Sequence, residues 1–598
     1  MSQNANSASK LKSLRAQMKT RGLAGYIIPR QDEFQGEYVG AYAERLRWLT
    51  GFAGSWGIAA VTLKSAVIFV DGRYTVQVRQ QVDSKLFQPR HLMTEPLTDW
   101  IAKTFRKGDR IGFDPWLLTA HDARKYSSAC NAIGAEFVVV TENLIDAIWN
   151  DQPERVTTPI VSHPHRFAGV NAKQKLTALQ KLLRNKNAAA VVVADPTSVA
   201  WLLNIRSADV PYTPVPLCHA IVHRVGKTQL FAATTRFSAK TKADIQSTVK
   251  ISAPQDFRSA LRKLGHAKQT VIVDPLQVSE FVRHTLAAAG AKIIEHPDPC
   301  MLPKALKSKA EQAGARSAQL RDGIAVANFL CWLDNNSGNG KLTERSVADQ
   351  LEVSRRANGK LIDLSFETIS AAGGNAALPH YHVPEGSGSQ LQRDAIFLID
   401  SGGQYLDGTT DITRTVIIGK PTTEMKDRFT RVLKGMIAIS TAAFPQGTTG
   451  AHLDALARNS LWKAGLDFDH GTGHGVGSFL SVHEGPARIS KTGHHALHPG
   501  MIISNEPGYY KLNHYGIRIE NLLLVIKAKG VPGADRAMLA FETLTLAPID
   551  RRLISQKLLT REELNWLDSY HARVFNALKP KVEEGTVSWL RKVCAPVK

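Results

Sequence analysis

The sequence has no long hydrophobic run, no closely spaced cysteines and no secretion signal. Its longest apolar stretches, such as residues 188–194, are far shorter than the ~18 residues that a membrane-spanning helix needs. The five cysteines lie far apart and form no CxxC pair, which argues against a disulfide framework and a cysteine-bound zinc site. The first residues lack the apolar core of a secretion signal. These absences predict a protein of the reducing cytoplasm with no membrane partner.

Motifs for several other chemistries are also missing. The glycine-rich stretch at 470–486 does not match the GxGxxG fingerprint of dinucleotide binding, because Val476 and Ser478 stand where glycine is needed. The GKT triplet at 226–228 is no phosphate-binding loop, because Ile221 replaces its first glycine. No GxSxG motif marks a serine nucleophile. The sequence therefore indicates neither a nucleotide cofactor nor a serine hydrolase.

Acidic residues are scarce relative to basic ones. Lysine and arginine number 75 against 53 acids, which gives a net charge of +22. A strongly basic chain raises the question of a nucleic-acid partner. The basic residues are spread along the chain, however, and no five of them are consecutive. A basic, solvated surface is therefore favoured, and we expect no nucleic-acid partner.

The first half of the chain contains a repeat. The segment that starts at Lys10 aligns without gaps with the segment that starts at Lys175. In both copies, apolar residues at helical spacing precede a short β-branched run, which predicts a helix followed by a buried strand. The matched helical positions are Leu11 with Leu176, Leu14 with Leu179, and Met18 with Leu183. We expect two α/β domains of one type, spanning roughly 1–160 and 161–303.

The remaining residues, 304–598, predict a third domain. Three prolines within residues 297–303 mark its boundary. Ser308 and Glu311 then form a capping box at the start of a long amphipathic segment, and helices alternate with paired strands beyond it. Thr560 and Glu563 predict a further helix in the tail. The chain is too long for a single core, and we expect an overall fold of the α/β (α+β) class.

Three aspartates lie close together at positions 400, 407 and 411. The flanking residues favour strands and the LDG triplet favours a turn, so this stretch predicts a hairpin. The hairpin would place Asp400 opposite Asp411 on one face, with Cβ atoms ~5 Å apart. Opposed carboxylates are destabilising unless a cation lies between them. Asp407, beside Gly408, is predicted to form the turn and to have no ligand role.

Histidines are interspersed with glycines in residues 470–486. His470 and His474 have helical spacing, but the glycines among them each cost a helix ~1 kcal/mol. Glycine instead lets the backbone approach another group closely. Three histidines in such a stretch, the third being His483, predict a ligand role for at least one of them.

Two further acids lie near predicted strands. Glu506 ends the apolar strand in MIISNEPGYY, and Glu520 lies inside the predicted strand GIRIENLLLVI. Alternation puts Arg518 on the same face as Glu520. A charge pair between these two residues is the alternative to a ligand role for Glu520.

Together these residues make a candidate site of four carboxylates and one imidazole. Burying four unpaired anions is prohibitive, whereas two divalent cations would cancel their charge. Carboxylate-rich ligation suits Mn²⁺, with Zn²⁺, Fe²⁺ and Co²⁺ as alternatives. Two metals ~3.5–4 Å apart can share a bridging water and polarise a carbonyl, which hydrolyses a bond without a protein nucleophile. The candidate ligands are Asp400, Asp411, His474, Glu506 and Glu520.

These motifs resemble those of the pita-bread metallopeptidases, and most closely the long, three-domain Xaa-Pro aminopeptidases. The similarity runs over nearly the whole chain and is densest from about 308 to 553. It is carried by IDSGGQYLDGTTDITRT, HGTGHGVGSFLSVHEGP, SNEPGYY and GIRIEN. It implies a C-terminal pita-bread catalytic domain behind two similar domains of the creatinase N-terminal type, which agrees with the repeat.

The resemblance also implies a role for each site residue. Asp400 would bind one metal, His474 and Glu506 the other, and Asp411 and Glu520 would bridge both. Glu506 would also shuttle a proton to the leaving nitrogen. The remaining implied roles are substrate binding and transition-state stabilisation for His380 and His483, pocket lining for His470, support of the carboxylates for Arg518, and substrate or subunit contact for Arg73.

The implied substrate is a peptide with proline in second position, cut by a water that bridges the two metals. A homodimer is the family expectation. One departure is His382, which makes an HYH triplet; we expect His380 to face the substrate. The alternatives are a prolidase-type dipeptidase of the same fold, which usually lacks the extra N-terminal domain, and a non-catalytic pita-bread binding module, which would have lost the ligands.

Overall fold

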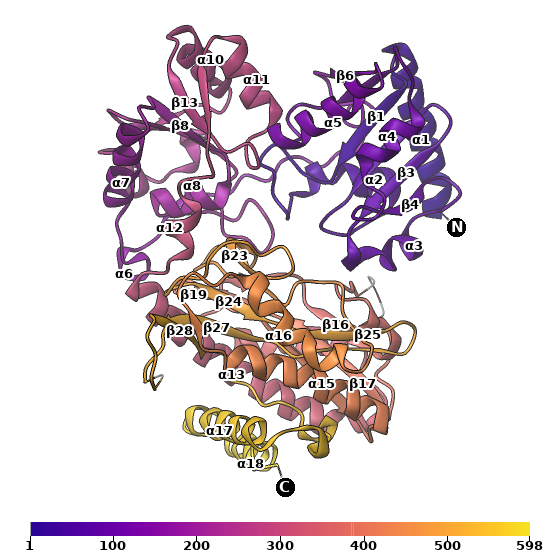
Figure 1. Ribbon diagram of the computed structural model, residues 1–598, viewed down its shortest axis with the longest axis vertical. Coiled ribbons are helices and arrows are strands. Elements are labelled where there is room, and N and C mark those ends of the chain that lie inside the picture. Colours follow the sequence, from indigo (N-terminus) through magenta and orange to yellow (C-terminus); the bar gives the residue numbers. More distant parts are fainter. Residues whose placement is uncertain (1, 384–385, 387, 531, 598) are drawn as a thin grey trace. The chain divides into compact units, whose positions relative to one another are not determined.

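The computed structural model describes residues 2–383, 386, 388–530 and 532–597. The chain divides into two compact units. Unit 1 contains the chain up to Pro164 together with Val170–Met301, and unit 2 contains His165–Gly169 together with the chain from Leu302 onward. Most of unit 2 is coloured orange to yellow in Figure 1. Within the described residues, no helix is both long and apolar enough to cross a membrane.

Unit 1 contains two six-stranded mixed sheets of the same topology, in the orders β4-β3-β2-β1-β5-β6 and β12-β11-β10-β8-β13-β14. In each sheet a central strand, β1 or β8, pairs antiparallel with one neighbour and parallel with the other. The first sheet consists of β1 (Gly25–Pro29), β2 (Ile58–Thr62), β3 (Ala66–Val70), β4 (Gln88–His91), β5 (Arg110–Phe113) and β6 (Glu136–Val139). The second consists of β8 (Ala190–Val193), β10 (His219–His223), β11 (Thr228–Phe231), β12 (Val249–Ser252), β13 (Thr270–Val273) and β14 (Lys292–Glu295).

Helices cover both sheets, and the predicted repeat is confirmed. Leu11, Leu14 and Met18 on the first helix, α1, are all buried, as are their counterparts on α7. Strands β7 (Val161–Ser162) and β9 (Ile205–Arg206) form a small separate pair. The helices of unit 1 are α1 (Ser2–Thr20), α2 (Arg45–Thr50), α3 (Gln77–Gln81), α4 (Leu97–Thr104), α5 (Ala120–Ala132), α7 (Ala172–Asn185), α8 (Pro196–Leu203), α9 (Ala239–Ile245), α10 (Asp256–His266) and α11 (Glu280–Ala288), with 3-10 turns η1 (Ala41–Ala43), η2 (Gly72–Tyr74) and η3 (Thr234–Arg236).

Unit 2 has a six-stranded sheet, β21-β28-β27-β24-β22-β23, and smaller sheets β16-β17-β20, β15-β18-β19 and β25-β26. All pairings in these sheets are antiparallel. The strands are β15 (Asp363–Leu364), β16 (Ile369–Ala372), β17 (Ala395–Ser401), β18 (Gly403–Tyr405), β19 (Gly408–Thr409), β20 (Ile412–Ile418), β21 (Phe444–Pro445), β22 (Gly473–Gly475), β23 (Glu484–Ile489), β24 (Ile502–Asn505), β25 (Gly508–Lys511), β26 (Tyr515–Arg518), β27 (Asn521–Lys527) and β28 (Met538–Thr543).

The helices of unit 2 begin where the capping signals predict. Ser308 caps α13 and Thr560 caps α17, each with a reciprocal glutamate three positions on. In Figure 1, α17 and α18 lie beside α13, and contacts join all three. The helices are α6 (His165–Ala168), α12 (Met301–Ala305), α13 (Lys309–Asn336), α14 (Glu344–Arg356), α15 (Thr423–Ser440), α16 (Gly450–Trp462), α17 (Arg561–Leu578) and α18 (Glu584–Val593), with 3-10 turns η4 (Ser337–Asn339), η5 (Gly373–Ala377), η6 (Arg551–Leu553) and η7 (Gln556–Leu558).

Two strand predictions near the candidate site are wrong. Asp400 pairs with Thr413 across β17 and β20, two positions away from the expected partner, Asp411. The reason is that the chain leaves this sheet after Ser401 and forms the separate hairpin β18–β19 before it returns. Glu520 lies outside any strand, in the two-residue break between β26 and β27.

The fold is the predicted one: two similar α/β modules precede a mixed α/β C-terminal region with a pita-bread arrangement. The division of the chain at 160 and 303 into three domains stays a prediction.

Candidate metal centre

Five separate elements of unit 2 bring the predicted ligands together. Asp400 lies in β17, Asp411 immediately precedes β20, and His474 is the middle residue of β22. Glu506 follows β24 directly, and Glu520 occupies the break between β26 and β27. All but Glu506 and His474 are almost fully buried. The sequence therefore folds so that strand ends deliver the acids to one place.

Their side-chain atoms are close enough to share an ion. One ligand atom from each of Asp411, His474 and Glu520 lies within 4.8 Å of the other two. His474 Nε2 is also 3.5 Å from Asp411 Oδ2 and 3.3 Å from Glu506 Oε1. An imidazole nitrogen and three carboxylates thus face a common point.

Glycine explains how β22 reaches this position. A side chain at Gly473 would collide with the carbonyl oxygen of Ser504 on the neighbouring strand β24, so only glycine allows the two backbones to approach. The backbone N–H of His474 donates to Ser504 Oγ over 3.0 Å. The predicted role of the glycines, close backbone approach in place of a helix, is confirmed.

The ring of His474 is held in the form that binds metals. Its Nδ1 lies 2.9 Å from the carbonyl oxygen of Gly475, which can only accept a hydrogen bond, so Nδ1 carries the proton. The lone pair is then on Nε2, the atom that faces Asp411 and Glu506. A backbone partner that fixes the tautomer in this way is typical of metal-ligating histidines.

Arg518 supports the carboxylates with three hydrogen bonds. It donates to Asp400 Oδ2 over 2.5 Å, to Thr413 Oγ1 over 3.1 Å and to the Tyr510 hydroxyl over 2.8 Å. Thr413 in turn donates to Glu520 Oε2 over 2.8 Å. Among the described residues, Arg518 therefore forms its ion pair with Asp400. The predicted alternative was a pair with Glu520 on the same strand face.

Arg414 holds the backbone that carries Glu520. This buried guanidinium donates to the carbonyl oxygen of Glu520 over 2.6 Å and to Asn521 Oδ1 over 2.9 Å. It also donates to the carbonyl oxygen of Ala547 over 2.8 Å and to the Tyr570 hydroxyl over 3.0 Å. The break between β26 and β27 is thereby tied to the C-terminal helix α17.

The crowded carboxylates resist ionisation without a counter-charge. Burial, followed by the charges of Glu520, Asp400 and Glu506, raises the pKa of Asp411 well above its usual range. Burial and the neighbouring acids likewise raise the pKa of Glu520 well above its usual range. Burial raises the pKa of Glu506 to about 7, although Arg518 and His483 oppose the shift. The single positive charge of Arg518 therefore does not balance the negative charges of four ionised acids.

The residues fit a pair of divalent cations. Asp400 Oδ1 is buried and makes no hydrogen bond within the described residues, although its sister oxygen is paired with Arg518. A buried carboxylate oxygen left in this state is costly, and an ion would satisfy it. The donor set of carboxylates with one imidazole is chemically suited to hard or borderline divalent metals.

The predicted substrate-binding histidines His483 and His470 contact residues of this site. The rings of His483 and His474 lie edge to face, with centroids 4.4 Å apart. His470 Nε2 lies 2.7 Å from the hydroxyl of Tyr510, the same hydroxyl that accepts from Arg518. His380 follows η5, a turn that packs against β17 and β26, the strands that carry Asp400 and Arg518.

The other predicted residues have clear local partners. His382 Nδ1 lies 2.9 Å from Glu367 Oε2, and both side chains are exposed. Asp407 occupies the two-residue turn between β18 and β19 and pairs with Arg321, so its turn position is confirmed. Arg73 pairs with Asp71 over 2.8 Å in unit 1, and its predicted contact with a substrate or a subunit stays a prediction.

Sequence reasoning missed Tyr510, Thr413 and Ser504. All three touch a predicted ligand or its support: Ser504 Oγ donates to Glu506 Oε1 over 3.0 Å, and Thr413 and Tyr510 bond to Arg518. Each lies within four positions of a predicted ligand in the sequence. Proximity to a motif is thus the one signal that could have found them.

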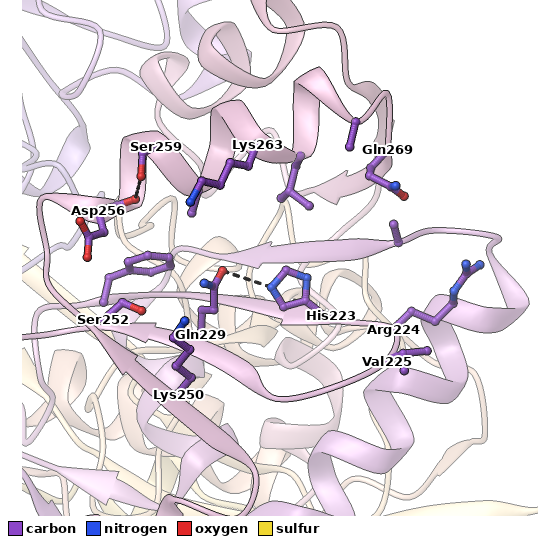
Figure 2. Close-up of a pocket in the computed structure, with 15 residues that line it drawn as sticks. His223, Arg224, Val225, Gln229, Lys250, Ser252, Asp256, Ser259, Lys263 and Gln269 are labelled. Atoms are coloured by element: carbon purple, nitrogen blue, oxygen red, sulfur yellow. Dashed lines mark hydrogen bonds between the residues drawn. The ribbon is translucent and has the colours of Figure 1, made fainter.

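A pocket of about 620 Å³ lies elsewhere, on the second sheet of unit 1. Figure 2 shows Lys263 from α10 above the pocket and Lys250, Gln229 and His223 from the sheet below it. The side chains of His223 and Gln229 are hydrogen-bonded to each other over 3.2 Å. None of the predicted site residues lines this pocket, which separates it from the candidate metal centre.

Family models match the chain along most of its length. Residues 10–148 and residues 151–311 each match a creatinase/prolidase N-terminal domain. Residues 313–527 match metallopeptidase family M24, and residues 537–597 match the C-terminal region of that peptidase family. All five predicted ligands fall within residues 313–527.

Full-length relatives give a narrower assignment. The chain is 38% identical to a probable Xaa-Pro aminopeptidase P of Paracoccidioides brasiliensis, with 99% of both chains covered. It superposes on the X-prolyl aminopeptidase of Caenorhabditis elegans, described as a cytosolic enzyme with a di-nuclear active site, with a TM-score of 0.94, 34% identity and 99% of both chains covered. A Xaa-Pro dipeptidase of Bacillus anthracis matches only 64% of this chain, with a TM-score of 0.52 and 20% identity. The chain therefore belongs to the Xaa-Pro aminopeptidase P group of metallopeptidase family M24.

Proposed function

We propose that this protein is a dinuclear metal-dependent aminopeptidase that removes the first residue from peptides with proline in second position. The observation that carries the proposal is the convergence of four buried or half-buried acids and one histidine from five elements. Such a cluster is costly as a purely structural feature, because each acid raises the ionisation cost of the others. Similarity to Xaa-Pro aminopeptidases over the full length supports the choice of reaction.

The ligand assignment follows from the donor set. Asp400 would hold one ion through Oδ1, His474 and Glu506 the second, and Asp411 and Glu520 would bridge the two. When bound, the ions would acidify a water molecule and polarise the substrate carbonyl. Mn²⁺ is the metal that we propose, because the ligands are mostly carboxylate oxygens; Zn²⁺ and Co²⁺ are the alternatives.

Glu506 is the residue suited to move a proton. Its Oε1 accepts a hydrogen bond from Ser504 over 3.0 Å, which leaves the carboxylate oriented toward the site. A carboxylate within hydrogen-bond reach of both the attacking water and the leaving nitrogen can accept a proton from one and give it to the other. Cleavage before proline needs this step, because the departing secondary amine must be protonated.

Histidines would hold the substrate around this centre. We propose that His483, beside His474, and His380 hydrogen-bond the peptide and stabilise the oxyanion as it forms. His470 and Tyr510, which are linked through their polar atoms, would line the pocket for the residue at the cut. Proline has no N–H and a fixed ring, so a pocket shaped for that ring can select it.

Two alternatives fit less well. A prolidase-type dipeptidase fits less well because such a chain is shorter: the B. anthracis dipeptidase matches only 64% of this chain. A non-catalytic binding module has no need of five intact ligand positions, and here all five carry ligand-type side chains. We also propose a cytoplasmic homodimer with no nucleic-acid partner, as expected from the sequence and its family resemblance.

Two tripeptides test the proposal. Purified protein loaded with Mn²⁺, Zn²⁺ or Co²⁺ is incubated with Arg-Pro-Pro and with Arg-Ala-Ala, and free arginine is measured. We expect release from Arg-Pro-Pro only, with Mn²⁺ the most effective metal. Equal cleavage of both peptides, or cleavage of neither under any metal, would refute the proposed activity. A preference for the dipeptide Arg-Pro would favour the prolidase alternative.

A further inference from the structure

Unit 2 also contains a fully buried acid that is not part of the metal cluster. Glu344 is the first residue of α14, and its side chain is 0% exposed. Its carboxylate accepts four hydrogen bonds, two on each oxygen. Oε1 accepts from the backbone N–H of Ala372 over 2.8 Å and from Asn375 Nδ2 over 2.9 Å. Oε2 accepts from the Tyr381 hydroxyl over 2.9 Å and from the backbone N–H of Ser389 over 2.7 Å.

The partners of Glu344 are all neutral. Among the described residues no lysine, arginine or histidine forms an ion pair with it. A buried carboxylate is costly to desolvate, but four charge-assisted hydrogen bonds offset that cost, since each is stronger than a neutral one. These four hydrogen bonds therefore hold the donor groups in position as well as the Glu344 carboxylate.

The four donors flank His380 in the sequence: Ala372 and Asn375 precede it, and Tyr381 and Ser389 follow it. Tyr381 is the next residue after His380, and Asn375 lies in the turn η5 before it. Asn375 Nδ2 also donates to the Tyr381 hydroxyl over 3.0 Å, which closes a triangle of side chains. His380 is thus connected on both sides to residues that Glu344 holds.

The turn η5, which contains Asn375, packs against two strands that carry residues of the candidate site. The turn η5 contacts β17 and β26, which carry Asp400 and Arg518. The backbone of Glu344 is also fixed, because its N–H donates to the Ser389 carbonyl over 2.9 Å and its carbonyl accepts from Ser370 Oγ over 2.7 Å. A shift of the Glu344 side chain would therefore move residues 375–381 relative to strands that are themselves held in place.

We propose that Glu344 is a positioning residue for catalysis: through Tyr381, Asn375 and two backbone N–H groups it sets the location of His380 beside the metal centre. The inference rests on the substrate-binding role that we propose for His380. Glu344 touches neither substrate nor metal. Its contribution is geometric, because misplacing a binding group by about 1 Å can cost roughly 100-fold in rate.

The primary test is Glu344→Gln with a matched change on the same helix, Glu352→Gln. Glu352 is partly exposed and, among the described residues, pairs with Arg356 alone. Glutamine replaces one carboxylate oxygen by an NH₂ group, which donates and cannot accept. The two hydrogen bonds that this oxygen of Glu344 accepts would therefore be lost. With Arg-Pro-Pro as substrate, we expect Glu344→Gln to lower kcat/KM roughly 10- to 100-fold. We expect no change for Glu352→Gln and full metal content in both variants.

A double-mutant cycle separates positioning from general structural damage. In a His380→Ala background, Glu344→Gln should lower kcat/KM little further, because the residue through which Glu344 acts is absent. An equal loss in both backgrounds would overturn the inference, as would wild-type kcat/KM in folded Glu344→Gln protein. Tyr381→Phe serves as a second variant should Glu344→Gln not fold: it removes one donor, and the inference predicts a smaller loss that also disappears without His380.

The wild-type enzyme in the same assay distinguishes failure of the proposed function from failure of the positioning role of Glu344. If the wild type cleaves Arg-Pro-Pro and the cycle is additive, the positioning role of Glu344 fails and the proposed function stands. If the metal-loaded wild type does not cleave Arg-Pro-Pro, the proposed function fails and the inference fails with it.

Discussion

Arg518 donates a hydrogen bond to Asp400 Oδ2 over 2.5 Å, while Asp400 Oδ1 stays buried with no hydrogen-bond partner in the described part of the chain. The two oxygens of one carboxylate are thus in opposite states. Arg518 fixes the orientation of the group through Oδ2, and the second oxygen is left available for a ligand. Under the proposed ligand assignment, one oxygen of Asp400 would bind an ion while the other is held by Arg518, which would explain why an arginine lies among the predicted ligands.

Replacement of Arg518 by lysine should impair the site although the charge is kept. Three acceptors around Arg518 need the planar, forked guanidinium, and a single ammonium group cannot reach all of them. We expect kcat/KM to fall roughly 10- to 100-fold and metal binding to weaken. Kinetics with Arg-Pro-Pro and a Mn²⁺ titration measure the two effects, with the exposed Arg316→Lys as control. Unchanged values for both would show that Arg518 only balances charge.

The two aspartates of the hairpin region should respond differently to the same substitution. Asp407 sits in a turn and pairs with Arg321 at a partly exposed position, where an ion pair contributes ~0–1 kcal/mol. Asp411 lies within 4.8 Å of the ligand atoms of His474 and Glu520. Asp407→Asn should therefore keep its activity, whereas Asp411→Asn should lose both activity and metal. Comparable losses in the two variants would contradict the assignment.

Metal removal should destabilise unit 2. Without cations, the burial and mutual repulsion that raise the pKa values of Asp411 and Glu520 oppose folding. A ligand present at 1,000 times its Kd stabilises a protein by about 4 kcal/mol. We expect Tm to fall after dialysis against a chelator and to return with Mn²⁺ but not with Na⁺. Calorimetry decides this, and a Tm that is indifferent to both treatments would be inconsistent with a metal site.

A buried histidine in unit 1 predicts loss of stability in acid. His219 stacks between Phe34 and Phe257, with ring centroids 4.6 and 4.4 Å away, and burial together with Arg155 lowers its pKa to about 3. The unfolded chain, with a histidine pKa of ~6.5, binds the proton more readily below that pH. Stability is therefore intact above pH ~6.5 and falls as the pH decreases toward 3, by up to about 2 kcal/mol at pH 5.

The variant His219→Phe should remove this contribution. The ring is apolar and fits between two phenylalanines, so the decrease in Tm between pH 7 and pH 5 should be smaller than in the wild type. His284→Phe, at an exposed position, should leave the decrease unchanged. If His219→Phe and the wild type lose the same Tm over this interval, the buried histidine is not responsible.

The residues that converge at the candidate site could be predicted from the sequence because most of them are acids at or near the ends of apolar strands. Asp400, Glu506 and the glycine-flanked His474 each break a local pattern, and no packing role explains them. The register of the strands could not be predicted in the same way. Gly402 lets the Thr410 carbonyl approach too closely for any side chain, so the chain leaves one sheet there for another. A continuous β-rich stretch gives no sign of that exit.

The supporting residues were not predictable for a different reason. Thr413 and Tyr510 are ordinary strand residues by composition, and their function comes from partners distant in the chain. Thr413 bonds to Glu520 across 107 positions, and Glu344 bonds to Tyr381 across 37. Such pairs depend on the tertiary fold, which packs β20 against β26 and β27 and α14 against β16, and no local sequence pattern predicts these contacts.

Anomalous diffraction from crystals soaked in Mn²⁺ tests the central claim most directly. The account predicts two peaks ~3.5–4 Å apart, one beside Asp400 Oδ1, the other beside His474 Nε2 and Glu506, with Asp411 and Glu520 between them. No peak at this position, or a single ion that leaves Asp400 Oδ1 without a contact, would contradict it.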